Sequence, residues 1–145
     1  MVEPLPEQLT ELTLAFERFT RRFKVAEATA AISNSLNALD VQALLFIGEH
    51  PHCKLSDVAG HLRVVLTTMS SSADRLVRRG MIERQRPETN RRAVALTLTR
   101  AGEDTVTGYM EGYREACSAM LEALDPMERD DFVRLTLKMA NTTLE

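Results

Sequence analysis

Arginines are crowded into one stretch of this 145-residue chain. Residues 61–100 contain nine arginines and three acidic residues, a local charge of +6, although the whole chain carries −3 and its remainder therefore −9. Guanidinium groups bind phosphates, and such contacts depend on where charges lie rather than on their sum. The stretch therefore predicts a surface that binds a polyanion, with a merely solvated charged face as the alternative.

A second group of candidate contacts lies on a helix predicted over residues 67–79. It consists of four small hydroxyl side chains and one arginine: Thr67, Thr68, Ser70, Ser71 and Arg75. Small hydroxyl groups near a helix N-terminus allow close approach to DNA and can bond base edges or phosphates. They can also simply cap the helix. The arginines that follow, Arg78 and Arg79 among them, favour nucleic acid.

Metal and redox chemistry have weaker candidates between residues 50 and 61, namely His50, His52, Cys53 and His61. Their spacing matches no recognised ligand pattern and falls on a loop expected to be exposed, so no metal site is predicted. Cys53, next to His52 and Lys54, is a better candidate for a sensing thiol than Cys117 on an apolar helix stripe. The sequence contains no phosphate loop, nucleophile elbow or catalytic carboxylate pair. We therefore expect that the protein is not an enzyme and has no cofactor.

The elements around the arginines follow from periodicity and from helix-ending residues. A helix begins at Asn37 or Asp40, either of which could cap it, and ends before Pro51. Ser56 is a candidate cap for a short helix, and Gly80 ends the helix over 67–79. The period then changes from 3.6 to 2, which predicts two strands, one from residue 81 and one over 94–98, joined by a polar turn.

Long amphipathic helices flank this region. Leu5 to Phe23 form an apolar stripe that suits packing on a partner chain, with packing inside one chain as the alternative. Thr99 can cap a fifth helix, and Asp125-Pro126 with Glu128 resembles a capping box for a sixth. The candidate dimerisation residues are Leu9, Leu12, Phe16, Phe19, Phe132 and Leu135.

Two short helices, a glycine and a β-hairpin are the order of a winged helix-turn-helix in a mainly α-helical chain. The stretch DVAGHLRVVLTTMSSSADRLVRRGMIERQRPETNRRAVALTLTRAG resembles the core of the MarR family, with its wing arginine and Leu-Thr-x-x-Gly ending. The resemblance implies a homodimer on a pseudo-palindromic DNA site. Residues 1–36 and 100–145 would supply N- and C-terminal dimerisation helices, and 37–99 the DNA-binding domain.

The resemblance also assigns roles in the wing. Arg92 takes the position of the wing-tip arginine that enters the minor groove, and Arg91 lies nearer the phosphates. The wing aspartate of the family is Asn90 here, and Glu88 can supply the missing charge. Two further departures are Val65-Leu66, where relatives usually have a polar cap, and Ser71, where an arginine is common.

These observations predict a cytoplasmic transcriptional regulator, a repressor more than an activator, whose partners are double-stranded DNA and a second copy of the chain. No membrane span is expected, since no apolar run approaches about 20 residues. A small-molecule effector fits the resemblance, although no residue identifies it. The alternatives are a winged-helix module that binds a protein partner and a metal- or redox-sensing regulator.

Overall fold

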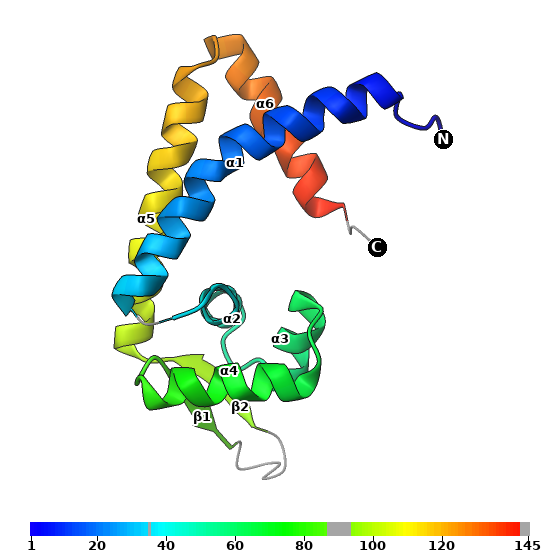
Figure 1. Ribbon diagram of the computed structural model, residues 1–145. Coiled ribbons are helices and arrows are strands. Elements are labelled where there is room, and N and C mark those ends of the chain that lie inside the picture. The colour runs from blue at the N-terminus through cyan, green and yellow to red at the C-terminus, as the bar shows by residue number, and fades with distance from the viewer. Residues whose placement is uncertain (35, 87–93, 143–145) are drawn as a thin grey trace. The chain divides into compact units, whose positions relative to one another are not determined.

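The computed structural model describes residues 1–34, 36–86 and 94–142, and the chain divides into two units, Met1–Met110 and Glu111–Glu145. In the described residues the elements are α1 Pro6–Asn34, α2 Ala38–Glu49, α3 Leu55–Leu62, α4 Leu66–Arg78, β1 Ile82–Gln85, β2 Ala95–Leu98, α5 Arg100–Glu122 and α6 Pro126–Asn141 (Figure 1). This order confirms a mainly α-helical winged helix-turn-helix with one β-hairpin.

Helix α2 is the centre of the winged helix-turn-helix, because it contacts α3, α4 and β2. The N–H of Asp40 donates to the side chain of Asn37 (2.9 Å), and the N–H of Asn37 donates to the Asp40 carboxylate (3.3 Å). This reciprocal capping makes Asn37 the N-cap and places Asp40 in the first turn. Leu44 and Ile47 project into the core with almost no exposure.

Helix α3 begins earlier than the sequence predicted. Its N-cap is Lys54, whose N–H donates to the Asp57 carboxylate (2.9 Å), so Ser56 lies inside the first turn and the prediction that it caps the helix was wrong. The reason is tertiary. Cys53 pairs with Leu96 of β2, which holds the chain beside this strand up to Lys54 and lets the helix begin immediately after it.

Helix α4 buries the face that its periodicity predicted. Met69, Ala73 and Leu76 are at most 1% exposed. The helix ends at Arg78, and Gly80 takes a left-handed conformation (φ +70°) that favours glycine. The predicted helix stop is confirmed, and the chain turns there into β1.

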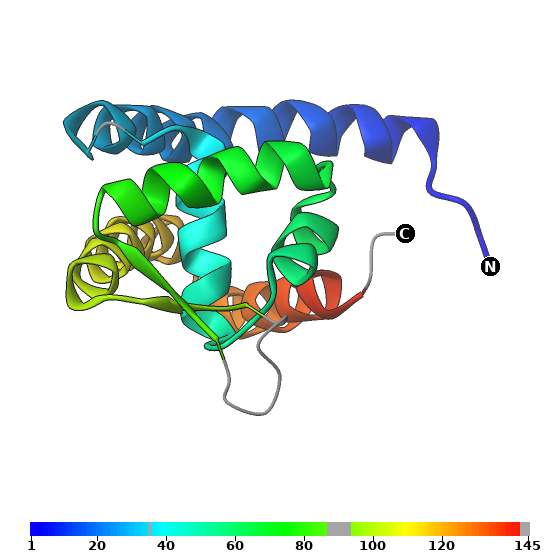
Figure 2. The same cartoon turned by 90° about the horizontal axis from the view of Figure 1, so that it is seen from below.

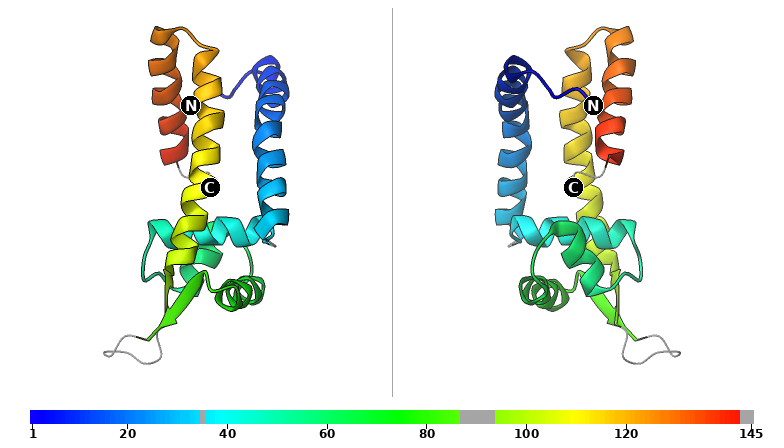
Figure 3. Two further views of the ribbon diagram at one scale, coloured as in Figure 1. Left: turned by 90° about the vertical axis from the view of Figure 1, so that its left-hand side faces the viewer. Right: turned by 90° about the vertical axis from the view of Figure 1, so that its right-hand side faces the viewer.

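The hairpin pairs β1 and β2 in antiparallel register, with Ile82 opposite Leu98 and Gln85 opposite Ala95. Both strands lead away from the helices of their unit (Figure 3). The Cys53–Leu96 bridge adds a short third partner on the other edge of β2. The hairpin predicted from the sequence is confirmed, whereas this added pairing was not anticipated.

The end of α4, the hairpin and α5 meet at Thr99. Its hydroxyl donates to the carbonyl of Gly80 (2.5 Å) and accepts from the N–H of Gly102 (3.1 Å), which confirms the predicted cap of α5. The backbone passes so close that a Cβ on Gly102 would lie 2.0 Å from the Met81 carbonyl oxygen. The Leu-Thr-x-x-Gly pattern thus has a structural cause. Thr99 connects the turn after α4 to the first turn of α5, and Gly102 leaves room for the backbone of Met81.

The C-terminal unit joins the end of α5 to α6. The N–H of Asp125 donates to Glu128 (2.8 Å), which confirms the predicted start of α6. Arg129 then donates from Nε to the carbonyls of Leu121 (2.7 Å) and Leu124 (3.0 Å), satisfying oxygen atoms at the end of α5 and in the turn after it. Among the described helices of both units, none has the length and apolar character needed to cross a membrane.

Replacing Gly102 with alanine tests the junction. We expect Gly102→Ala to lower the free energy of unfolding by about 1–3 kcal/mol, since the new methyl group overlaps a backbone carbonyl that cannot move alone. The measurement is urea denaturation. Gly60→Ala is the matched control, because nothing lies within 4 Å of a Cβ there, and it should be neutral or stabilising by up to about 1 kcal/mol. Equal effects of the two changes would contradict the steric argument.

Candidate nucleic-acid interface

The outer face of α4 carries the hydroxyl groups that the sequence selected. Thr67, Thr68 and Ser71 are exposed, Ser70 is half-buried, and the Ser71 hydroxyl donates to the Thr67 carbonyl (3.2 Å). Seen from below, α4 crosses in front of α2 with this part of the unit uncovered (Figure 2). The structure therefore brings together four of the predicted contacts on one accessible helix.

The N-terminus of α4 keeps its first N–H groups available. Val65 is the N-cap and has no side chain able to accept a hydrogen bond, and the first turn contains no acidic residue. The first intrahelical bond runs from the Met69 N–H to the Val65 carbonyl (3.1 Å). Uncapped N–H groups give this end of a helix partial positive charge, which attracts an anion.

Arg75 lies in a different environment from the hydroxyl residues. Its Nε and Nη2 atoms donate to the carboxylate of Asp40 on α2 (3.2 and 2.9 Å), and the Ser72 hydroxyl donates to the same carboxylate (2.5 Å). Asp40 is 1% exposed, whereas the Arg75 side chain is 36% exposed. Arg75, predicted to contact DNA, thus joins α4 to α2 and keeps only part of its guanidinium group accessible.

The pKa of Asp40 shows which effect dominates in this network. Burial by itself would raise the pKa of this carboxyl, but hydrogen bonds from Arg75, Ser72 and Asn37 outweigh burial and lower it. The same pairing raises the pKa of Arg75. Asp40 is therefore ionised at neutral pH and α4 is held to α2 by a charge-assisted pair.

A second ion pair neutralises the negative charge of Asp74 on α4. Asp74, the one acidic residue in this helix, pairs with Arg84 of β1, while Arg78 and Arg79 at the C-terminal end are exposed. The exposed surface of α4 therefore combines hydroxyl groups at its start with positive charge at its end, as contact with a polyanion requires.

The predicted wing residues Glu88, Asn90, Arg91 and Arg92 lie outside the described residues. The described part of the hairpin ends at the exposed Arg86 on one side and at Val94 on the other.

Cys53 and the nearby histidines lie in different environments in the described part of the chain. Cys53 is buried, contrary to the exposed loop that the sequence predicted, because it pairs with Leu96. Burial and the nearby charge of Asp57 raise the pKa of its thiol, which opposes thiolate formation. His50 and His61 are exposed and contact the Phe46 ring (4.3 and 4.7 Å between centroids), and no group of three metal ligands occurs among the described residues.

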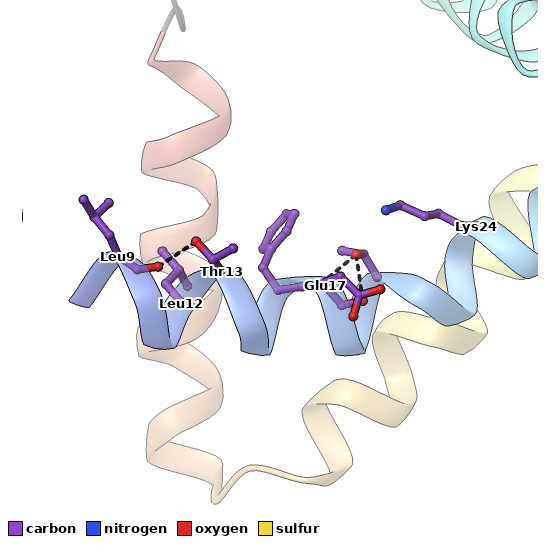
Figure 4. Close-up of a pocket in the computed structure, with 7 residues that line it drawn as sticks. Leu9, Leu12, Thr13, Glu17 and Lys24 are labelled. Carbon is purple, nitrogen blue, oxygen red and sulfur yellow. Dashed lines mark hydrogen bonds between the residues drawn. The ribbon is translucent and has the colours of Figure 1, made fainter. Parts of the chain in front are cut away.

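The predicted dimerisation residues remain largely uncovered. Leu9, Leu12, Phe16 and Leu135 are exposed, and Phe19 and Phe132 are half-buried. Along α1 a groove of about 490 Å³ is lined by Leu9, Leu12, Thr13, Phe16, Glu17, Thr20 and Lys24 (Figure 4). Leucine and phenylalanine side chains this exposed would be favourably removed from water by a partner surface.

Residues 36–94, which contain α2, α3, α4 and β1, match the model of the MarR family. Over these residues the chain is similar to the MarR family. The HTH-type transcriptional regulator BilQ of Clostridium symbiosum (strain WAL-14163) is 29% identical over 99 residues, covering 68% of this chain and 69% of BilQ. RV1404 of Mycobacterium tuberculosis has a similar structure (TM-score 0.78, 23% identity, covering 100% of this chain and 99% of that one). So does FabT of Streptococcus pneumoniae in complex with DNA (TM-score 0.71, 22% identity, 88% and 94% covered).

Within residues 36–94, sequence reasoning missed Asp40 and Ser72 as members of the α2–α4 contact. One signal was present: Ser72 and Arg75 are three residues apart on one face of α4, and Ser72 continues the apolar face of that helix. A polar residue on a buried face needs a hydrogen-bonding partner. Nothing local identified Asp40, 32 and 35 residues away, as that partner.

Removing the arginine of the pair should destabilise the domain. We expect Arg75→Ala to lower the free energy of unfolding by about 2–3 kcal/mol, because it leaves the buried carboxylate of Asp40 short of a positive partner. The loss stays below that of a fully buried pair, since Arg75 is 36% exposed. Denaturation of Arg75→Ala in the wild-type and Asp40→Asn backgrounds measures the coupling.

Arg78→Ala is the control for this pair, because Arg78 is an exposed arginine of the same helix and its loss should cost less than about 0.5 kcal/mol. Identical costs for Arg75→Ala with and without Asp40→Asn would refute the coupling.

The lowered pKa of Asp40 also predicts how stability depends on pH. The contribution of Asp40 to the free energy of unfolding is complete above about pH 4, the range where an unfolded aspartate is ionised. This contribution is lost as the pH falls through the folded-state pKa.

Proposed function

We propose that this protein is a sequence-specific DNA-binding transcriptional regulator that acts as a homodimer on a pseudo-palindromic site. The observation that supports this most directly is the accessible face of α4 in a MarR-family segment, with hydroxyl groups at one end and exposed arginines at the other. FabT, a protein of similar fold, has been seen in complex with DNA. Duplex DNA as the target also implies that the protein works in the cytoplasm.

In this proposal α4 lies in the major groove, which is wide enough to admit a helix. Thr67, Thr68, Ser70 and Ser71 approach base edges or phosphates, and the uncapped N–H groups at the start of α4 favour a phosphate. Arg75 has a double role: its pair with Asp40 orients the helix, and its exposed edge adds positive charge to the interface. Phosphate contacts then orient the protein, while base contacts select the sequence.

The hairpin extends the interface to the neighbouring minor groove. Arg92 enters that groove and Arg91 contacts the phosphates beside it, while Asn90 and Glu88 restrain the wing arginine. Arginine suits a narrow minor groove because the negative potential there is strongest. These four roles rest on the resemblance of the wing segment to the MarR family.

A second copy of the chain covers the apolar residues of the flanking helices. Residues 1–36 and 100–145 form the dimer, and 37–99 bind DNA, so that two α4 helices address half-sites about one helical turn apart. Repression, with release by a small-molecule effector, is the mode of regulation that we propose.

Binding of selected genomic fragments tests the function. The purified protein is used to capture duplexes from its native genome, and affinity is then measured by fluorescence anisotropy at several salt concentrations. We expect enrichment of an inverted repeat and a fall of log affinity with log salt. Failure to bind any duplex at low ionic strength would instead favour a winged-helix module that binds a protein partner.

The wing is tested by Arg92→Ala on the enriched site. We expect weaker binding and a salt slope reduced by about 1, because one guanidinium contact with the phosphate-rich groove is lost. Arg134→Ala is the matched control, since Arg134 is an exposed arginine of α6 and pairs with Asp131. If Arg92→Ala and Arg134→Ala gave the same slope as the wild type, the role of Arg92 would be withdrawn.

The dimer is tested by Phe16→Glu, followed by sedimentation velocity. We expect dissociation to monomers, because an ionised carboxylate would be moved into an apolar interface without a partner. Arg18→Glu introduces the same group on α1 but outside the apolar stripe, and it should leave the dimer intact. A dimeric Phe16→Glu protein would show that this stripe is not the interface.

A further inference from the structure

Two aliphatic side chains at the start of α4 are exposed in a region whose other large apolar groups are covered. Val65 is 66% exposed and Leu66 is 54% exposed. Between residues 36 and 109, leaving out 87–93, they are the only large hydrophobic residues that are exposed. Leu62 and Val64, the apolar neighbours before them, are packed against the core. The exposure therefore belongs to these two positions and not to the loop as a whole.

Neither residue is explained by the stability of α4. A Ser, Thr, Asp or Asn at the N-cap position stabilises a helix by about 1 kcal/mol relative to an apolar residue, and Val65 provides no such bond. Leu66, the first helical residue, leaves most of its side chain in water. Apolar residues in a position that favours a polar one point to a surface that covers them in a complex.

Charge complementarity identifies that surface as DNA. The next exposed residues along α4 are Thr67, Thr68 and Ser71, and the helix ends in exposed arginines, with its one acid already paired to Arg84. A polyanion suits this combination. In the major groove of a duplex, the C5 methyl group of thymine is the apolar feature that side chains contact, and the N-terminal residues of a recognition helix are those that reach base edges.

We propose that Val65 and Leu66 form an apolar contact with thymine methyl groups, so that each half-site contains thymine opposite the first turn of α4. The inference rests on the proposed DNA-binding function and adds a base preference to it. The neighbouring hydroxyl groups form hydrogen bonds with the DNA, whereas Val65 and Leu66 select thymine by excluding water from its methyl group.

Replacing thymine by deoxyuridine removes only that methyl group and tests the contact. On the enriched site, deoxyuridine at the half-site thymines should weaken binding of the wild type about fourfold for each methyl group lost. The variant Val65→Ala/Leu66→Ala should bind the thymine site more weakly and lose less than twofold on deoxyuridine substitution. Alanine is a good helix former, so α4 is retained, and circular dichroism verifies this.

Two controls separate this contact from DNA binding in general. Ser71→Ala changes a hydroxyl residue on the same helix and should keep the full loss on deoxyuridine substitution. Deoxyuridine outside the half-sites should have no effect on the wild type. Half-sites without thymine, or an equal loss for the wild type and the double alanine variant, would overturn the inference while leaving DNA binding intact. Absence of binding to every duplex would overturn the proposed function itself.

Discussion

The carboxylate of Asp40 is almost completely buried between α2 and α4, and an ion in that position must be paired. Arg75 and Ser72 satisfy it from α4, and Asn37 satisfies it from the start of α2. One group therefore caps one helix and orients another. Two interactions together define which face of α4 is exposed. Met69 and Leu76 determine which side of the helix is buried, and the pairing of Asp40 with Arg75 restricts how α4 lies on α2.

A second constraint connects α4 to the hairpin and to α5. Thr99 bonds to Gly80 and to Gly102, and the absence of a side chain at Gly102 lets the backbone of Met81 pass. Arg84 and Asp74 add an ion pair between β1 and α4. The recognition surface is thus held to the strands that carry the wing and to the helix that continues toward the C-terminal unit.

The distribution of side chains matches the separation of roles that we propose. Positive charge gathers between residues 61 and 100, and exposed apolar groups gather on α1 and α6. In the function that we propose, electrostatic attraction would bring the protein to DNA, while apolar burial would hold two copies together. Val65 and Leu66 are apolar residues within the charged region, and this departure from the pattern is what distinguishes them.

Local interactions made much of the fold predictable. Helix periodicity, the Gly80 stop, the Thr99 cap and the start of α6 depend on residues within a few positions of one another, so the sequence alone determined them, together with the hydroxyl face of α4. Only the tertiary structure decided that Arg75 pairs with Asp40, that Cys53 is buried beside Leu96, and that α3 begins after Lys54 rather than at Ser56. The first depends on two residues 35 positions apart, and the other two depend on the pairing of Cys53 with Leu96, 43 positions apart. No periodic pattern in a sequence specifies which distant residue fills a given space.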